Sequence, residues 1–153
     1  EAASDALIVR SSWLFGMGRS NFVMRLFELV MVKKEIPVVT DRRGTPTYTA
    51  DLAEAVAALL EKGASGLFHV SNAGECSWYE YAVEIIKVLG VTECKIKPVT
   101  SDAFPRPAPR PAYTVLDNGK YLGVTGKTLR PWQESLAFFL SNLNTEMSPS
   151  DIL

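Results

Sequence analysis

The sequence is poor in the residues that hold metal ions or form disulfides. Its 153 residues include two cysteines and one histidine, and Cys76 and Cys94 form no Cys-x-x-Cys pair. A structural zinc site takes four such ligands, usually at close spacing. We therefore predict no metal site and two reduced thiols, with a disulfide between Cys76 and Cys94 as the alternative.

Excess basic charge and long apolar runs are also lacking. The chain has 16 Lys and Arg residues against 17 Asp and Glu residues, and its net charge is −1. Nucleic acids and anionic membrane surfaces both attract basic faces. No apolar run approaches the ~20 residues of a transmembrane helix, and the first residues do not resemble a signal peptide. We predict a cytoplasmic protein that binds neither nucleic acid nor a membrane.

The apolar residues that are present follow an alternating pattern of strands and helices. Hydrophobic residues make up 47% of the chain, which is typical of a globular domain. We expect one domain over residues 1–143 and a frayed polar tail over 144–153. The order predicts an α/β fold with a largely parallel sheet. Strands are expected at 6–12, 36–40, 66–71 and 95–100, and helices at 22–33, 50–62, 78–89 and 132–143.

Helix starts are indicated by residues whose side chains accept hydrogen bonds from free backbone amides. Ser20 or Asn21 is expected to cap the first helix, and Thr49 the second. Ser77 and Glu80 have the spacing of a capping box before the third helix. The first helix is apolar nearly all round, which predicts burial on more than one side.

Residues 16–21, with the sequence GMGRSN, follow a strand and open a helix, as a dinucleotide-binding loop does. The third glycine of that pattern is replaced by Asn21, and the first glycine comes after the chain has left the strand. Asp41, in the place of the ribose-binding acid, is followed by Arg42 and Arg43. We interpret this segment as a turn leading into a capped helix.

Several segments together carry a more specific signal than any one of them. The segments are ALIVRSSWLFG (6–16), NF (21–22), GTPTY (44–48), DLA (51–53), GLFHVS (66–71), SWYEYA (77–82), RPA (110–112) with LD (116–117), and PW (131–132). In their order and spacing they resemble the dTDP-4-dehydrorhamnose reductases, which belong to the extended short-chain dehydrogenase/reductase superfamily. The resemblance covers the C-terminal half of that family and implies the C-terminal part of a Rossmann-like fold, with its small substrate-binding α/β subdomain.

The resemblance implies an enzyme that reduces a 4-keto sugar with NADPH or NADH in dTDP-L-rhamnose synthesis. In the family, the dinucleotide loop and a Tyr-xxx-Lys pair lie in the N-terminal half, where the tyrosine donates a proton and the nicotinamide a hydride. None of the five tyrosines here has a lysine four residues later. We therefore name no catalytic residue and expect this chain alone to be inactive and to bind no cofactor. Its start at Glu1, not Met, favours a fragment that lacks the N-terminal dinucleotide-binding half.

The resemblance also assigns candidate site residues to a dTDP-sugar and a cofactor. Trp13 would offer a flat apolar face to the deoxysugar. Arg110, in the proline-rich loop 104–111, would present a guanidinium fork to the diphosphate. Core packing for Trp13 and an exposed loop position for Arg110 are the alternatives. The candidate substrate-binding residues are Trp13, Asn21, Thr47 and Arg110, and the candidate cofactor-binding residues are Arg10 and Ser12.

Other functions fit the same sequence. A non-catalytic regulatory relative of the family, or a freestanding module that binds a nucleotide or a protein, would keep the fold without the chemistry. The family often has Gln where Arg42 stands, and usually Tyr where Phe15 stands. These departures bear on the exact substrate. A sheet cut before residue 6 would leave an open strand edge, so we also predict that the chain associates with itself.

Overall fold

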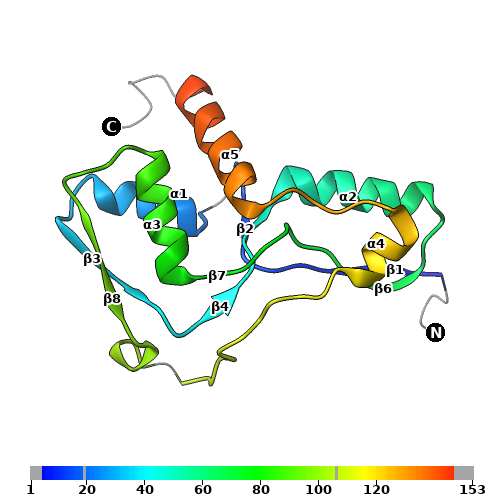
Figure 1. Ribbon diagram of the computed structural model, residues 1–153, viewed down its shortest axis with the longest axis horizontal. Helices are drawn as coiled ribbons and strands as arrows, with labels where there is room; N and C mark the ends of the chain where they lie inside the picture. The colour runs from blue at the N-terminus through cyan, green and yellow to red at the C-terminus, as the bar shows by residue number, and fades with distance from the viewer. Residues whose placement is uncertain (1–4, 19, 106, 147–153) are drawn as a thin grey trace.

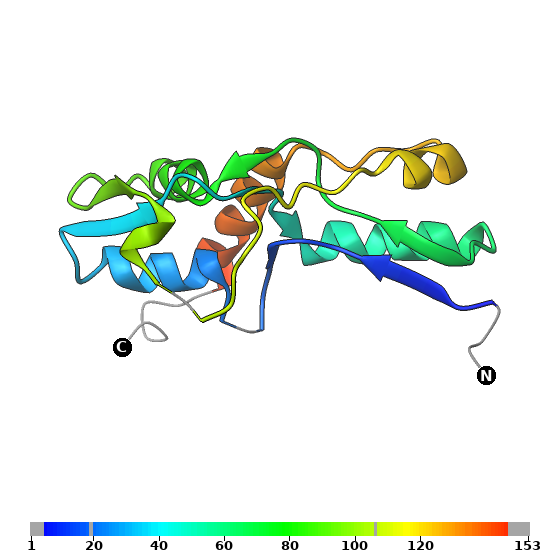
Figure 2. The ribbon, with the colours of Figure 1, turned by 90° about the horizontal axis from the view of Figure 1, so that it is seen from below.

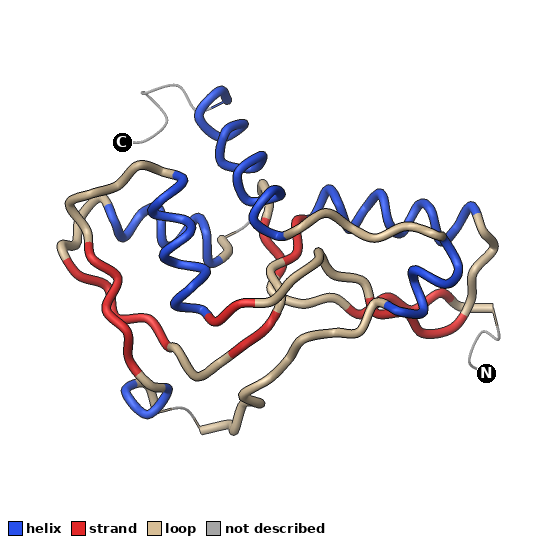
Figure 3. Tube along the Cα trace, viewed as in Figure 1, coloured by secondary structure: helices blue, strands red, loops and turns tan. Residues whose placement is uncertain are grey.

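The computed structural model describes residues 5–18, 20–105 and 107–146, and the side chains up to residue 143. Figures 1 and 3 show an elongated molecule with two lobes that meet near its middle. The strands are β1 Leu7–Arg10, β2 Leu14–Phe15, β3 Glu35–Val39, β4 Arg43–Gly44, β5 Thr47–Tyr48, β6 Gly66–His69, β7 Cys76–Ser77 and β8 Lys95–Val99. The helices are α1 Phe22–Val30, α2 Thr49–Glu61, α3 Trp78–Val88, α4 Gly119–Thr125 and α5 Trp132–Glu146, with a 3₁₀ turn at Ser101–Ala103.

The described strands pair two by two. β1 with β6, β2 with β5, and β3 with β8 are parallel pairs, and β4 with β7 is antiparallel. The predicted α/β class and the largely parallel pairing are confirmed, but the described strands form four separate pairs and not the single sheet that was expected. The two longer parallel pairs lie in different lobes, so they cannot extend one another (Figure 1).

The β1 lobe consists of β1, β6, α2 and α4. Its core contains Leu59 from α2, Phe68 from β6 and Tyr121 from α4. Figure 2 shows β1 at the outer side of this lobe, with α2 and α4 both on its inner side. Ile8 and Leu67, which are partners in the β1–β6 register, are 54% and 38% exposed. This pair of strands is therefore covered on one face by described residues and open on the other.

The β3 lobe consists of α1, β3, α3, β8 and α5. Its core is larger and rich in aromatic rings, among them Phe15, Tyr81, Trp132 and Phe139. The prediction that α1 is buried on more than one side was wrong at its end. The helix ends at Val30, and the next two apolar residues, Met31 and Val32, are 65% and 78% exposed. The run of apolar residues therefore continues beyond the end of the helix. The lobe also holds both cysteines, Cys76 and Cys94, which are buried and free.

The capping predictions were partly confirmed. The side chain of Asn21 accepts from the amides of Val23 and Met24, and Ser77 and Glu80 form the expected capping box. The prediction for Thr49 was wrong. The structure places Thr49 inside α2, with its side chain packed against Gly16. A β-carbon on Gly16 would overlap the Thr49 hydroxyl. The last helix runs to Glu146, three residues past the predicted boundary, and residues 147–153 of the predicted tail lie outside the described residues.

A buried polar network joins the two lobes. Asp51, on α2, accepts hydrogen bonds from Arg130, from the Ser135 hydroxyl on α5, and from the Asn72 carboxamide. Burial alone would raise the pKa of the Asp51 carboxyl, but these three donors outweigh it and hold the pKa below its ordinary value of 3.8. The carboxylate is thus the shared acceptor at the contact between the lobes.

The described residues include neither a helix that could cross a membrane nor a group of side chains that could hold a metal ion. No helix in residues 5–146 combines the length and apolar character that crossing a membrane requires. Within the same described residues, no three or more His, Cys, Asp or Glu side chains are grouped so that they could hold a metal ion.

Candidate functional site

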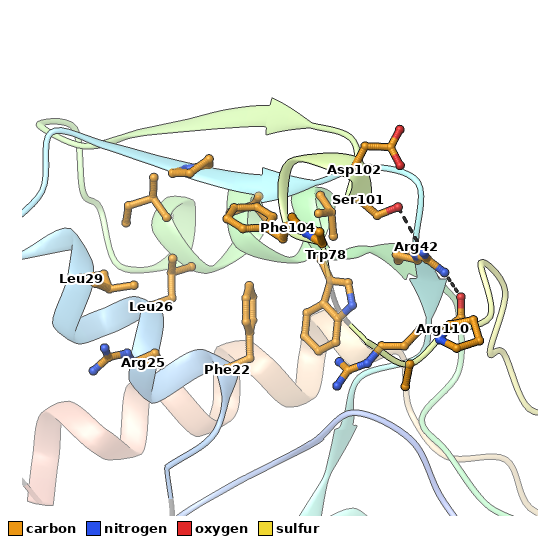
Figure 4. A pocket seen from close by; sticks show the side chains of 17 residues that line it. Phe22, Arg25, Leu26, Leu29, Arg42, Trp78, Ser101, Asp102, Phe104 and Arg110 are labelled. Carbon is orange, nitrogen blue, oxygen red and sulfur yellow. Dashed lines mark hydrogen bonds between the residues drawn. The ribbon is translucent and has the colours of Figure 1, made fainter.

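The β3 lobe contains a cleft of about 720 Å³. It lies between α1, β3, the start of α3 and the loop of residues 101–110 (Figure 4). Leu26 and Leu29 form the apolar wall on the α1 side, and Ile36 and Val38 form the wall on the β3 side. A cleft of this size with apolar walls and a few polar groups is typical of a small-molecule site.

Three aromatic rings line the cleft. Phe22 comes from the first turn of α1, Trp78 from the first turn of α3, and Phe104 from the loop. The centroids of the Phe22 and Trp78 rings are 4.6 Å apart, and the rings are tilted by 59°. Both residues follow a capped helix start, so the caps at Asn21 and Ser77 fix where these rings stand. Such rings can stack on a planar heterocycle.

Cationic side chains surround the same cleft. Arg25, Arg42 and Arg110 line it, against one lining carboxylate, Asp102. Arg25 also forms an exposed ion pair with Glu28 on the same helix, at 3.0 Å. Figure 4 shows the Arg110 side chain extending from the loop toward Trp78. The cleft therefore joins apolar surface to an excess of positive charge, which suits a planar apolar group attached to an anion.

Arg42 and Asp41 hold the loop in place. The Arg42 guanidinium donates to the backbone carbonyl of Arg110 and, at 3.1 Å, to the Ser101 hydroxyl. Asp41 accepts from the Ser101 hydroxyl at 2.7 Å and from its amide at 3.0 Å, and the hydroxyl bond is the main reason that the pKa of Asp41 is lowered. This pair ties the end of β3 to both ends of the loop that carries Arg110.

Trp13 lies directly behind the cleft. Its indole stacks on that of Trp78, with ring centroids 3.7 Å apart and 16° between the planes. The backbone of Trp13 has φ 44°, in the left-handed region, which costs a residue other than glycine about 1–2 kcal/mol. A methyl group on Gly44 would overlap the indole, so Gly44 leaves the space in which the ring lies.

Thr47, Ser12 and Arg10, the other predicted site residues near Trp13 in the structure or the sequence, differ in burial and in hydrogen bonding. Thr47 is fully buried; its amide donates to the Trp13 carbonyl at 3.2 Å, and its hydroxyl has no hydrogen-bond partner among the described residues. The Ser12 hydroxyl donates to the Thr45 carbonyl at 2.8 Å, and Arg10 is exposed at the end of β1.

The structure thus brings together only some of the predicted site residues. Arg110 lines the cleft, Asn21 caps the helix that carries Phe22, and Trp13 and Thr47 lie just behind the cleft wall. Arg10 and Ser12 lie toward the β1 lobe and do not line it. Sequence reasoning missed the lining residues Arg25, Arg42, Trp78 and Phe104, because their nearness to the cleft depends on contacts between distant segments.

Comparison with solved structures defines the class of fold. The dTDP-glucose 4,6-dehydratase of Bacillus anthracis str. Ames shares the fold at 16% identity, with a TM-score of 0.73, over 92% of this chain and 45% of that one. The two chains therefore share an α/β fold, which is the predicted fold class. Residues 1–145 match the family model of the RmlD substrate binding domain, and the chain belongs to this family.

Two curated relatives and two solved structures show how far the likeness extends. The spore coat polysaccharide biosynthesis protein SpsK of Bacillus subtilis (strain 168) is 44% identical over 89% of this chain and 47% of its own length. The dTDP-4-dehydrorhamnose reductase of Streptomyces griseus is 38% identical over 84% of this chain and 44% of its own length. The chain thus spans about half the length of the curated relatives it matches.

Among solved structures, the dTDP-4-dehydrorhamnose reductase of Clostridium acetobutylicum ATCC 824 matches with a TM-score of 0.84 and 42% identity, over 90% of this chain and 49% of that one. The corresponding enzyme of Bacillus anthracis str. Ames, in complex with NADP, also gives 0.84, at 36% identity, over 89% and 48%. The predicted family, and the predicted restriction to about half of it, are confirmed.

Proposed function

We propose that this chain is the substrate-binding part of an NAD(P)H-dependent dTDP-4-dehydrorhamnose reductase, and that its cleft binds the nucleotide of a dTDP-sugar. The observation that carries the proposal is the meeting of aromatic rings and arginines in one cleft. Phe22 and Trp78 offer ring faces to a base, and Arg110 offers a guanidinium fork to the diphosphate next to it. The family match and the names of the relatives support the same substrate class.

The hexose of the dTDP-sugar would lie beyond Trp78, toward Trp13 and Thr47. The indole of Trp13 suits an apolar sugar face, and Thr47, which is fully buried, supports that indole through the bond from its amide to the Trp13 carbonyl. Arg10 and Ser12 would wall the nicotinamide end. This chain's part in the reaction is to bind and orient the sugar, since none of its five tyrosines is followed four residues later by the lysine of the family's proton-donating pair.

We infer that the described start of α1 does not bind a phosphate of the dinucleotide. At the start of α1, the amides of Val23 and Met24 are already bonded to the side chain of Asn21. We therefore place the NADPH or NADH site, and the acid that protonates the keto oxygen, in a separate dinucleotide-binding half. We expect this chain alone to be inactive and to work only with that half.

A second candidate is a non-catalytic regulatory or nucleotide-binding relative. The cleft is complete without any Tyr-xxx-Lys pair in this sequence, so it could serve binding alone. The two candidates differ in one measurable respect. Addition of a relative's dinucleotide-binding half would restore 4-keto reduction of a dTDP-sugar in the first case and not in the second.

The test of the nucleotide site is calorimetric titration of the chain with dTDP and, separately, with NADPH. We expect dTDP to bind and Arg110→Ala to weaken it roughly ten- to hundred-fold, which is the usual worth of a charge-assisted hydrogen bond. Lys62→Ala, which removes an exposed cation from the β1 lobe, is the control and should not alter binding. Failure of the native chain to bind dTDP would contradict the proposal. Binding of NADPH instead would assign the dinucleotide site to the glycine turn at 16–18.

A further inference from the structure

The backbone at Trp13 is in an unfavourable conformation. Among the described residues it is the one non-glycine position with positive φ, at 44°. A bulky residue keeps such a conformation only where its surroundings fix it, and residues of this kind occur often at ligand sites. The question is which neighbours hold Trp13 there and what its ring is held for.

Three contacts fix Trp13. Its indole stacks on Trp78 at 3.7 Å, its carbonyl accepts from the amide of Thr47 at 3.2 Å, and its ring lies over Gly44, where any β-carbon would overlap it. Trp78 is itself held firmly. It is the first residue of α3, directly after the capping box of Ser77, and its amide donates to the Arg42 carbonyl at 3.3 Å.

The Trp78 ring contacts Trp13 and also lines the cleft. In the cleft, the centroid of the Phe22 ring is 4.6 Å from that of Trp78. The proposed nucleotide site and the proposed sugar site therefore share this one indole as their common wall. Any shift of Trp78 would move Trp13 as well.

We propose that Trp78 is a positioning residue that, together with Gly44, fixes the Trp13 indole as the wall against which the hexose of a dTDP-sugar packs. This proposal rests on the proposed function and deepens it. The stack sets which sugars fit, because a rigid indole face favours a hexose with an apolar, deoxygenated edge. Because Trp78 also lines the nucleotide cleft, Gly44, which acts on the Trp13 ring, is the position at which discrimination among sugars can be separated from nucleotide affinity.

The stack can be measured without any ligand. Two indoles this close and nearly parallel should give an exciton couplet in the circular dichroism of the native chain. We expect Trp13→Phe and Trp78→Phe each to abolish the couplet, and Trp132→Phe to keep it, because Trp132 takes no part in the stack. We also expect Gly44→Ala to reduce it, since the new methyl group pushes the Trp13 ring aside. A couplet that survives Gly44→Ala would overturn the role assigned to Gly44.

The functional test measures the affinities of the chain for dTDP-rhamnose and for dTDP and takes the ratio of the first to the second. The ratio tests the role of the stack, and the dTDP affinity by itself tests the proposed function. In Gly44→Ala we expect the ratio to fall about tenfold while dTDP affinity stays within about twofold. Trp78→Ala should lower both the ratio and the dTDP affinity, because Trp78 also lines the cleft, and Trp78→Phe, which keeps a ring, should restore part of each. An unchanged ratio in a Gly44→Ala protein that has lost its couplet would overturn the inference. Loss of dTDP binding in the native chain would instead contradict the proposed function.

Discussion

The two lobes bury their apolar residues in different ways. The β3 lobe surrounds its aromatic core with three helices and a strand pair, and apolar and aromatic side chains also line its cleft. The β1 lobe covers one face of β1 and β6 with α2 and α4 and leaves Ile8 and Leu67 exposed on the other. Parallel strands are normally covered on both faces. From this contrast we expect the cleft of the β3 lobe to hold a small ligand and the open face of the β1 lobe to be covered by more protein.

The junction between the lobes should give the largest effect. Asp51→Asn keeps the shape of the side chain but removes the charge that Arg130 and Ser135 bond, so we expect the free energy of unfolding to fall by about 2–4 kcal/mol. Urea denaturation measures this. Glu61→Gln, on the exposed end of the same helix, is the control and should change little.

Asp51→Asn should also change how the free energy of unfolding depends on pH in acid. Because the folded pKa of Asp51 lies below its ordinary value of 3.8, the carboxylate stabilises the fold above that value. This contribution is lost as the pH falls from about 3.8 toward the folded pKa. Asp51→Asn should flatten the curve in that window. An equally steep acid limb in the variant would show that Asp51 does not link the lobes as described.

The open face of β1 and β6 gives the second test, of association and not of folding. We expect the native chain to self-associate through this face and the double variant Ile8→Lys with Leu67→Lys to be monomeric, because charges on an exposed sheet face oppose pairing with a second copy. Analytical ultracentrifugation at high micromolar concentration measures the difference. Leu60→Lys, at an equally exposed position on α2, should leave the association unchanged; monomeric native protein would contradict the prediction.

The smallest effect is expected in the aromatic core of the β3 lobe. Burial raises the pKa of Tyr81 well above 10, and its hydroxyl has no hydrogen-bond partner among the described residues. Tyr81→Phe should therefore leave the unfolding free energy unchanged or raise it by about 1 kcal/mol. Tyr113→Phe, which removes an exposed bond to Glu75, is a matched comparison with little expected effect. A clear loss of stability in Tyr81→Phe would show that the hydroxyl matters and not the ring alone.

The sequence predicted what depends on neighbouring residues. Asn21 and the Ser77–Glu80 box act within one turn of helix, and both were confirmed. Thr49 was predicted as a cap by residue type alone, and the prediction was wrong because its side chain packs beside Gly16, far away in the chain. Local signals are lost wherever a distant segment competes for the same side chain.

The cleft was only partly predictable for the same reason. Arg110 was found through the family resemblance, and the structure places it in the cleft lining. Arg42 and Trp78 were not, because nothing near them in sequence shows that Arg42 reaches the loop at Ser101 or that Trp78 lies between Trp13 and the cleft. Pairings across some sixty residues are set by the fold as a whole.

The path of the chain between the lobes has a consequence for how the molecule assembles. After β1 the chain enters the β3 lobe, returns for α2 and β6, leaves again for α3 and β8, returns for α4, and ends in α5 (Figure 1). The parallel pairs β1–β6 and β3–β8 each join segments separated by a lobe crossing. Chains rich in such distant pairings close large loops before contacts form, and they fold slowly. Neither lobe is a continuous stretch of the chain, so neither could be excised as a single peptide, and we expect the two lobes to unfold together.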